Sequence, residues 1–374
     1  MSLLKSRFIE LIGNIQNPKY QLVELNEICE FIKDGTHQTP IYTEDRVNGF
    51  KFLSSKDVTS QKINWSNIKY IPKELHEQLY AKLSPKRGDI LLAKNGTTGV
   101  AAVVDSDEIF DIYVSLALLR PKSGVNVSYL CSALNSEDLK RQFNSSLKGI
   151  GVPNLHLREI KKARIIFPPI DIQNKISSIT KQIDKSKFLL QQILEKFELL
   201  KKSRFIEMFG DVINNKKTWP TKRWSDVLNI VNGKNQKKVE CENGIYPICG
   251  SGGKIGKTNE YLTKENSVII GRKGNINNPI LMKTKFWNVD TAFGLEPNNK
   301  DINVEYLYKF CELFDFQRLN KTVTIPSLTK SDLLKIEIPV PPMKLQEEYR
   351  NFLAQVDKSK LIIQKALEDL VGKV

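Results

Sequence analysis

The stretch that organises the chain is residues 167–210, FPPIDIQNKISSITKQIDKSKFLLQQILEKFELLKKSRFIEMFG. Its apolar residues recur in alternating steps of three and four, the 3.5-residue period of a coiled-coil seam. The predicted seam, with Ser186 in its one polar position, runs through Ile176, Ile179, Ile183, Leu190, Ile193, Phe197 and Leu200. The pattern predicts one amphipathic helix after Pro168–Pro169, which from Asp171 to Phe209 would extend roughly 58 Å.

Parts of this stretch recur at both ends of the chain. Residues 3–13 (LLKSRFIELIG) match residues 199–210, and residues 341–374 repeat the beginning of the stretch 173 positions later, including Pro341–Pro342, Gln346 and VDKSK. The second seam consists of Tyr349, Phe352, Val356, Ile363, Ala366 and Leu370. We therefore expect a second long spacer helix whose first part is 341–374 and whose tail is 1–14. The two helices would lie antiparallel, as a circular repeat with a pseudo-twofold axis.

Two globular regions lie between the helical segments 1–14, 168–210 and 341–374. They span 15–167 and 211–340 and share VNVSYL/INVEYL, VPNL/IPSL and ARIIFPP/KIEIPVPP. Each contains short strand-like runs that end at proline or turn residues, with short helices between them. The sequence predicts an α+β protein with two mixed α/β domains separated by two long antiparallel helices. Similar frameworks with different loops indicate two sites of one kind with different specificity.

Composition restricts the class of protein. The 374 residues carry a formal net charge of +15, which favours a polyanionic partner, nucleic acid first, although a generally lysine-rich proteome would give the same balance. The five cysteines lack CxxC spacing and pair with no histidine, which indicates reduced thiols in a cytoplasmic protein without a metal site. No run of 18 apolar residues predicts a membrane span.

The candidate DNA contacts lie in loops that correspond between the two regions. ILLAKNGTTGVAAVV (90–104) and VIIGRKGNINNPILM (268–282) both read as strand, tight polar turn and strand, and KDGTHQTP (33–40) corresponds to NGKNQKK (232–238). Arg, Lys, Asn and Gln are the side chains that pair with base edges. The candidates are His37, Gln38, Lys94, Asn95, Thr97, Thr98, Lys148, Lys234, Asn235, Ser251, Lys254, Arg272, Lys273, Asn275 and Lys321. For any single residue, an ordinary solvated loop is an equally good interpretation.

No catalytic motif stands beside these loops. GSGGKIGKT (250–258) superficially suggests a phosphate-binding loop, but Ser251 occupies the position where G-x-x-x-x-G-K-[ST] requires its first glycine. The better interpretation is a flexible loop whose Lys254 and Lys257 approach DNA phosphates. The chain offers binding surfaces and a spacer rather than catalytic residues, although a self-contained enzyme with an unrecognised site stays open.

The strand-Pro-Pro-x-x-x-Gln helix starts (IIFPPIDIQNKI and IPVPPMKLQEEY), the circular repeat and the YPICGSGG…VIIGRKG…FGLEP pattern resemble the specificity subunits of type I restriction–modification systems. The resemblance covers the whole chain. It implies two target-recognition domains that each read half of a bipartite, asymmetric double-stranded DNA target, and helices that set the spacer. Only the tail of the second helix stands at the N-terminus, as in short members of the family.

The resemblance also implies partners and a division of chemistry. Two modification (methyltransferase) subunits would dock on the helices and carry S-adenosylmethionine, and restriction (motor-nuclease) subunits would bring ATP and Mg. This chain itself would be non-catalytic and hold no cofactor. The alternatives are the specificity subunit of a methylation-only or type II-like fused system, or an architectural coiled-coil scaffold that binds DNA.

Overall fold

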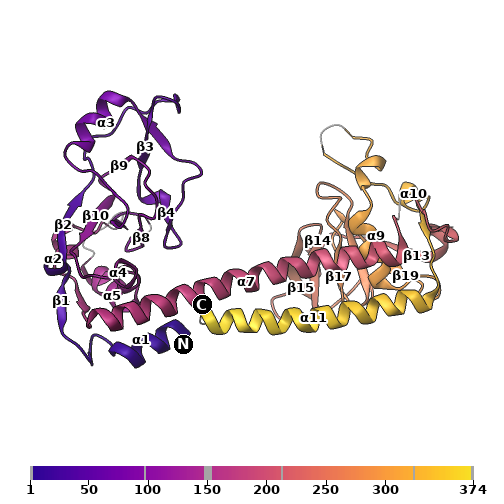
Figure 1. Ribbon diagram of the computed structural model, residues 1–374. Helices are drawn as coiled ribbons and strands as arrows, with labels where there is room; N and C mark the ends of the chain where they lie inside the picture. The colour runs from indigo at the N-terminus through magenta and orange to yellow at the C-terminus, as the bar shows by residue number, and fades with distance from the viewer. Residues whose placement is uncertain (1–2, 97, 147–153, 212–213, 323–324, 372–374) are drawn as a thin grey trace. The chain divides into compact units, whose positions relative to one another are not determined.

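The computed structural model describes residues 3–96, 98–146, 154–211, 214–322 and 325–371. The chain forms two compact units. Unit 1 comprises Met1–Leu189 with Ala366–Val374, and unit 2 comprises Leu190–Lys365. Helix α7 (Ile170–Phe209) is continuous through the point where the units join, as the heptad pattern predicts (Figure 1). Unit 1 therefore holds residues from both chain ends, as the circular repeat requires.

Unit 1 is built on three small sheets and a separate strand pair (Figure 1). The strand orders are β1(Leu22–Glu24)-β11(Arg164–Ile166), β2(Cys29–Asp34)-β10(Leu116–Pro121)-β7(Ile90–Ala93)-β8(Ala101–Val103), β6(Lys69–Ile71)-β3(Phe50–Leu53)-β9(Phe110–Ile112) and β4(Val58–Thr59)-β5(Lys62–Ile63). Its helices are α1(Leu3–Ile12), α2(Leu25–Ile28), α3(Lys73–Tyr80), α4(Val127–Leu134), α5(Glu137–Ser146) and α6(Leu157–Lys162), with a 3₁₀ turn at Ser55–Asp57.

Unit 2 repeats the two-, four- and three-stranded sheets of this plan, and its described residues form no counterpart of the β4–β5 pair. Its sheets are β12(Thr221–Arg223)-β20(Glu337–Pro339), β13(Leu228–Asn232)-β19(Ala292–Pro297)-β16(Ser267–Gly271)-β17(Ile280–Met282) and β15(Gly253–Thr258)-β14(Tyr246–Gly250)-β18(Trp287–Asn288). Its helices are α8(Trp224–Val227), α9(Val304–Leu313), α10(Lys330–Leu333) and α11(Met343–Val371), with a 3₁₀ turn at Phe316–Leu319. In both units the three-stranded sheet contains one parallel pair, β3–β9 or β14–β18. The predicted internal repeat of two mixed α/β domains is confirmed.

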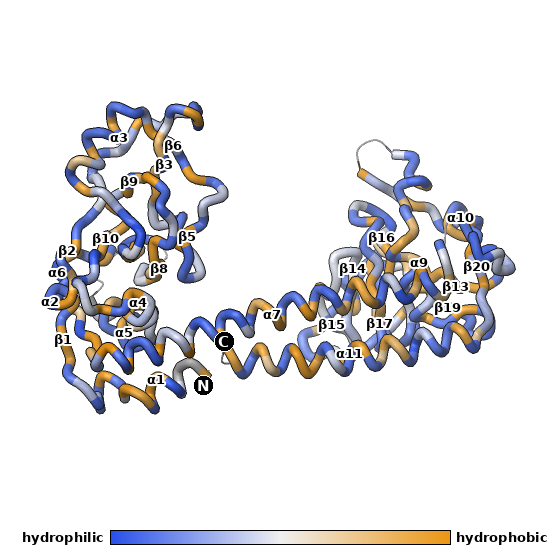
Figure 2. Tube along the Cα trace, viewed as in Figure 1, coloured by the Kyte–Doolittle hydropathy of each residue, from blue (hydrophilic) through white to orange (hydrophobic). Residues whose placement is uncertain are grey.

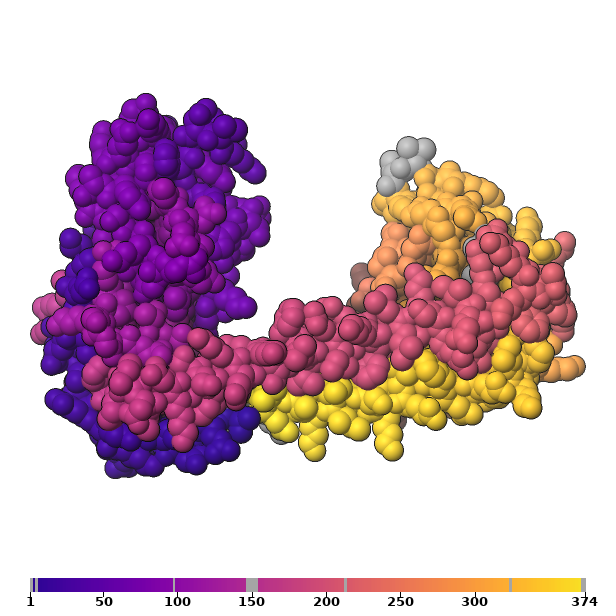
Figure 3. Space-filling model, in the orientation of Figure 1, coloured from indigo at the N-terminus to yellow at the C-terminus, as the bar shows by residue number. Residues whose placement is uncertain are grey.

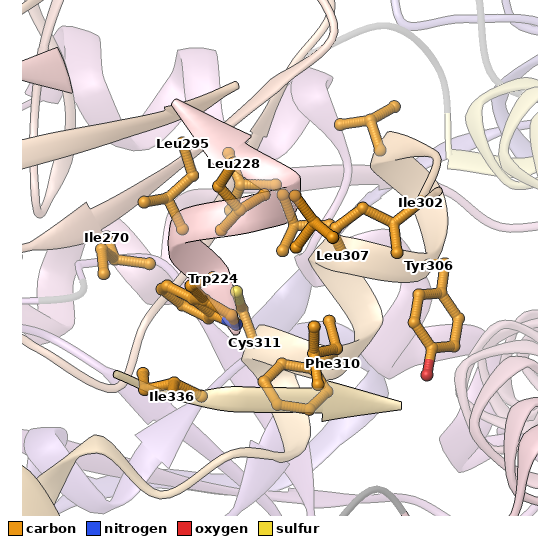
Figure 4. Packing of buried hydrophobic residues seen from close by; sticks show 14 of the residues in the cluster. Trp224, Leu228, Ile270, Leu295, Ile302, Tyr306, Leu307, Phe310, Cys311 and Ile336 are labelled. Atoms are coloured by element: carbon orange, nitrogen blue, oxygen red, sulfur yellow. The ribbon is translucent and has the colours of Figure 1, made fainter. Parts of the chain in front are cut away.

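The core of unit 2 lies between its four-stranded sheet and helix α9. Figure 4 shows Trp224, Ile270 and Leu295 facing Phe310 and Cys311 of α9, all buried. Trp224 is fully buried and is the largest side chain of the cluster. Burying an apolar side chain of this size contributes up to roughly 3 kcal/mol, and the unpartnered indole N–H of Trp224 offsets part of it. The ring packs α8 against Phe310 of α9.

The Pro-Pro-x-x-x-Gln motif fixes each long helix to its domain. Gln173 is buried; its amide oxygen accepts from Asn126 N at 3.0 Å, and its amide nitrogen donates to Pro168 O at 2.8 Å. Asn126 caps the N-terminus of α4 by accepting from Tyr129 N. The glutamine therefore joins the start of α7 to the start of α4.

Unit 2 uses the same device with one more hydrogen bond. The amide oxygen of Gln346 accepts from Asn303 N at 2.9 Å, and its amide nitrogen donates to Pro341 O and Asp301 O, both at 2.8 Å. Gln346 is fully buried. Because each bond satisfies a buried backbone group, loss of the amide would leave those groups unpaired.

The repeated KSRFIE segments end two helices in the same way. Gly13 and Gly210 adopt φ of 79° and 81°, and their amides donate to Ile9 O and Ile206 O, which closes the last turn of α1 and of α7. A lysine further along the chain, Lys19 or Lys217, donates to a carbonyl of the same turn. The N-terminal copy is therefore a true helix tail that ends like α7.

In unit 2 the second half of α7 packs antiparallel against α11, which lies along it in Figure 3. Lys201 Nζ lies 2.6 Å from Asp357 Oδ1, and Lys360 Nζ lies 2.6 Å from Glu198 Oε1. The residue numbers rise on one helix as they fall on the other, which confirms the antiparallel prediction. These ion pairs are partly exposed, so each contributes about 0–1 kcal/mol and serves register more than stability.

Burial along the two helices agrees with part of the predicted seam. Among its residues the following are buried or partly buried: Ile176, Ile179, Ile183, Leu190, Phe197, Tyr349, Phe352, Val356, Ile363, Ala366 and Leu370. Ile193 and Leu200 do not belong to it, because they are 37% and 46% exposed and Leu194 takes the inward position. A straight helix of 3.6 residues per turn drifts by about 20° per heptad from the 3.5-residue pattern, so a seam drawn by heptads leaves the packed face within a few turns.

No helix in the part of the chain that the structure describes is long and apolar enough to cross a membrane.

Candidate nucleic-acid interface

The two stretches form the predicted antiparallel strand pairs, β7 with β8 and β16 with β17. The strands are separated by residues 94–100 and 272–279, which is longer than the predicted tight turns. Lys94 and Arg272 directly follow the first strand of each hairpin and occupy equivalent positions. Lys94 N donates to Ser115 O at 2.8 Å, and Arg272 N donates to Thr291 O at 2.8 Å. The strand register agrees, because the preceding residues pair with Leu116 of β10 and Ala292 of β19.

The segment before α6 or α10 folds back onto each hairpin. Leu155 N donates to Lys94 O at 3.0 Å, and Leu328 N donates to Arg272 O at 2.9 Å. These leucines belong to the VPNL and IPSL motifs. The repeat therefore conserves a backbone framework that brings this segment beside the hairpin turn in both units.

The first loop of each unit joins the same place. Gly35 N and Gly233 N donate to the first residue of β10 and β19, each at 3.2 Å. A Cβ at Gly35 would lie 2.1 Å from Ile112 O, and one at Gly233 would lie 1.8 Å from Val289 O. Only glycine permits this approach. The loops at 33–40 and 232–238 therefore start beside the hairpin turns, so each unit gathers its candidate residues from separate loops.

In unit 1 the structure does not expose Lys94 for the predicted base contact, which stays a prediction. Its side chain is buried, and Nζ lies 2.6 Å from Asp34 Oδ1 at the end of β2. His37 is 78% exposed, and its Nε2 lies 3.8 Å from the other oxygen of Asp34. A buried lysine needs such a carboxylate to remain charged, and this pairing leaves it turned away from solvent.

The other candidates of unit 1 surround that ion pair. Gln38 is exposed, and Asn95 is partly buried and forms a β-bridge with Asn154. Thr98 is partly buried, and its hydroxyl donates to Lys94 O at 3.3 Å. Thr97 and Lys148 lie outside the described residues. His37, Gln38 and Asn95 stay predictions as DNA contacts.

Unit 2 presents more exposed charge at the equivalent place. Arg272 is partly exposed; its Nη1 donates to Asp290 O at 3.4 Å and its guanidinium carbon lies 5.9 Å from the centroid of the Phe293 ring. No carboxylate of a described residue lies within 4.0 Å of it. Lys273 and Asn275 are exposed at the turn. These side chains can reach a phosphate or a base edge without losing an internal ion pair.

The remaining candidates of unit 2 lie on neighbouring loops. Lys234 and Asn235 are exposed, and the backbone of Lys234 is held by Asn288 O and the Trp287 indole nitrogen at 3.0 and 2.9 Å. Ser251 lies beside the hairpin, with its Cβ 3.1 Å from where a Cβ at Gly271 would stand.

The stretch 250–258 closes the β14–β15 hairpin instead of leading into a helix. Lys254 and Lys257 are exposed on β15. Burial raises the pKa of the Cys249 thiol to about 11, and the nearby charge of Lys254 acts in the opposite direction. Lys321 is 75% exposed and paired with Asp332 at 2.9 Å. The β14–β15 hairpin therefore presents a basic surface and does not form a phosphate-binding loop.

Sequence reasoning missed Asp34 and Asn232, which precede Gly35 and Gly233. The aligned loops KDGTH and VNGKN contain the signal, because the position before the glycine holds a carboxylate in the first loop and an amide in the second. No group of three or more His, Cys, Asp or Glu side chains within the described ranges could hold a metal ion. The site offers hydrogen-bond donors and positive charge, which suits recognition of DNA.

Comparison with known proteins agrees with this architecture. A family model described as the type I restriction modification DNA specificity domain matches residues 17–199 and 216–371. The putative type I restriction enzyme MjaX specificity subunit of Methanocaldococcus jannaschii is 20% identical over 96% of this chain and 93% of its own length. The MjaIX specificity subunit of the same organism is 26% identical over 45% of this chain and 42% of its own.

Solved structures share the fold. A chain from a study of complex assembly and conformational transition of the type I R-M system aligns with a TM-score of 0.66 and 17% identity, and 95% of each chain is covered. The S subunit of a type I system from M. genitalium aligns with a TM-score of 0.52 and 16% identity, over 95% of this chain and 94% of that one. With two copies of the domain matched over most of its length, the chain belongs to the family of type I restriction–modification DNA specificity subunits.

Proposed function

We propose that each unit reads one half of a bipartite, asymmetric double-stranded DNA target through the loops that follow β2 and β7 in unit 1 and β13 and β16 in unit 2. Family membership supports DNA target recognition by two domains. The assignment of individual residues is our own.

The observation that carries this proposal is one framework with two sets of side chains. The turn after β7 carries the partly buried Asn95, whose amide oxygen is buried without a hydrogen-bond partner, whereas the turn after β16 carries the partly exposed Arg272 and the exposed Lys273. Arg pairs bidentately with guanine and Asn with adenine, at about 1–3 kcal/mol of discrimination per pair. Equivalent backbones with different donors suit a target whose two halves differ in sequence.

The long helices would dock two modification subunits. Figure 2 shows apolar positions recurring along α7 and α11. The exposed large apolar residues on these helices, from 37% to 66% exposed, are Ile170, Phe188, Leu189, Ile193, Leu199, Leu200, Ile206, Leu361 and Ile362. Exposed apolar side chains along these two helices suggest a protein interface, and a modification subunit of the same system would suit it.

In this proposal the chain binds DNA and sets the distance between the two half-sites, and its partners carry out methylation and cleavage in the cytoplasm. The modification subunits hold S-adenosylmethionine and methylate adenine N6, and restriction subunits with ATP and Mg join them for cleavage. A methylation-only system would use the same chain without the restriction subunits.

The test is methylome sequencing of a methylation-free host that expresses this chain with the methyltransferase encoded beside it. We expect N6-methyladenine in a bipartite, asymmetric motif with a fixed spacer. The Arg272→Ala variant should relax the bases of one half only, while Gln355→Met, an exposed change on α11, should leave the motif intact. A single contiguous motif, or relaxation of both halves by Arg272→Ala, would overturn the proposal.

A further inference from the structure

The two units place a basic residue at the same point of the same framework but treat its charge differently. Lys94 and Arg272 are equivalent by their backbone hydrogen bonds. Asp34 and Asn232 are also equivalent, because each ends the first strand of its four-stranded sheet and pairs with the second residue of β10 or β19. Each unit therefore has a basic residue (Lys94 or Arg272) after its first hairpin strand and an equivalent residue (Asp34 or Asn232) that could pair with it.

In unit 1 the partner is a carboxylate. Asp34 Oδ1 accepts from Lys94 Nζ at 2.6 Å, and the two side chains are 14% and 5% exposed. The exposed His37 approaches the other carboxylate oxygen. Removing Lys94 from this carboxylate would leave a buried charge unpaired, which is strongly unfavourable. The lysine is therefore withheld from any ligand at the surface.

In unit 2 the partner is an amide. Asn232 is exposed and carries no charge that could hold Arg272. The guanidinium makes one long hydrogen bond to Asp290 O and lies near the Phe293 ring. Neither contact neutralises it, and most of its donors remain available. Its planar fork suits a phosphate or a guanine edge better than a lysine does.

We propose that the residue before the glycine shared by both units (Gly35 and Gly233) decides whether the following hairpin contributes a cation to DNA: Asn232 leaves Arg272 free to bind, whereas Asp34 withdraws Lys94. This inference rests on the proposed function and deepens it, because it makes the two half-sites electrostatically unequal. Unit 2 binds its half-site with one more positive charge at this position, and unit 1 relies on neutral donors there.

The decisive variant is Asn232→Asp, which supplies unit 2 with the carboxylate that unit 1 already has. Position 232 is exposed, so the change buries no charge and the fold should persist. The matched uncharged control is Asn232→Ser. Each protein is the full chain with the modification subunits that co-purify with it. The probes are a labelled duplex that carries the motif found by methylome sequencing and a scrambled duplex of the same composition.

We expect Asn232→Asp to weaken binding of the motif duplex roughly 5- to 150-fold, the range for losing one base-edge or phosphate contact. The slope of log affinity against log salt should fall by about one, while Asn232→Ser stays at the wild-type values. In an Arg272→Ala background Asn232→Asp should add nothing further. An equal loss in both backgrounds would mean general repulsion of DNA and would overturn the inference, as would equal behaviour of the Asp and Ser variants.

The reciprocal variant Asp34→Asn should release Lys94 and raise the salt slope by about one, and an unchanged slope in the folded variant would overturn the unit 1 half of the inference. These outcomes are separate from failure of the proposed function, which would appear as a wild-type complex that binds motif and scrambled duplexes equally.

Discussion

Replacing Gln346 or Gln173 with methionine tests how the repeated motif holds each helix. Methionine is similar in size but cannot donate or accept the amide hydrogen bonds. Gln346 makes three such bonds and Gln173 makes two, all to backbone groups, and both side chains are buried. At about 1 kcal/mol per bond, Gln346→Met should cost about 3 kcal/mol and Gln173→Met about 2 kcal/mol.

Hydrogen–deuterium exchange can measure these costs in each unit separately, because local opening reports local free energy. Amides of α9 should exchange about 150-fold faster in Gln346→Met, and amides of α4 about 30-fold faster in Gln173→Met, since about 1.4 kcal/mol corresponds to tenfold. The exposed Gln355→Met and Gln182→Met are the controls on the same helices and should change exchange little. Equal acceleration by both buried variants, or none, would refute the hydrogen-bond account of the motif.

Other predictions concern the site and the helices. Lys94→Met should lower the free energy of unfolding by about 3 kcal/mol because it leaves Asp34 partly buried and unpaired; urea unfolding should show recovery in the double variant with Asp34→Asn, and an unchanged midpoint would contradict the buried pair. Arg272→Ala should reduce specific binding by about 1–3 kcal/mol in a fluorescence titration, and an equal loss on random DNA would indicate a phosphate contact instead. Leu361→Glu should abolish co-purification of the modification subunit, whereas retention would exclude this face from docking. Four residues inserted near Ser186 should lengthen the methylation spacer by about 6 Å, a little under two base pairs, and an unchanged spacer would exclude the helix as the ruler.

The role of the repeated loops could be predicted only in part. The Asn95–Gly96 turn and the glycines at 35 and 233 are local signals, so the hairpins and loop starts followed from the sequence. Which lysine faces solvent did not. Lys94 and Asp34 are 60 residues apart, and their contact depends on how β2 and β7 flank β10. Lys94 follows β7 and Asp34 ends β2, two strands that do not pair with each other, and β10 between them sets their separation. No local sequence pattern specifies that arrangement.

The sequence by itself determined the long helix, its repeat at the chain ends and the two-domain plan. Hydrophobic periodicity, prolines that end strands and a constant offset of 173 residues between the repeats can all be read along the chain. Only the tertiary structure decided that Leu194 rather than Ile193 faces inward on α7 and that Lys94 is neutralised while Arg272 is free. Period alone defines a stripe, but the drift of a 3.6-residue helix and the packing of its neighbours decide which residues on that stripe are covered. Likewise, charge alone predicts a basic surface, but burial and pairing across the sheet decide which charges remain available to DNA.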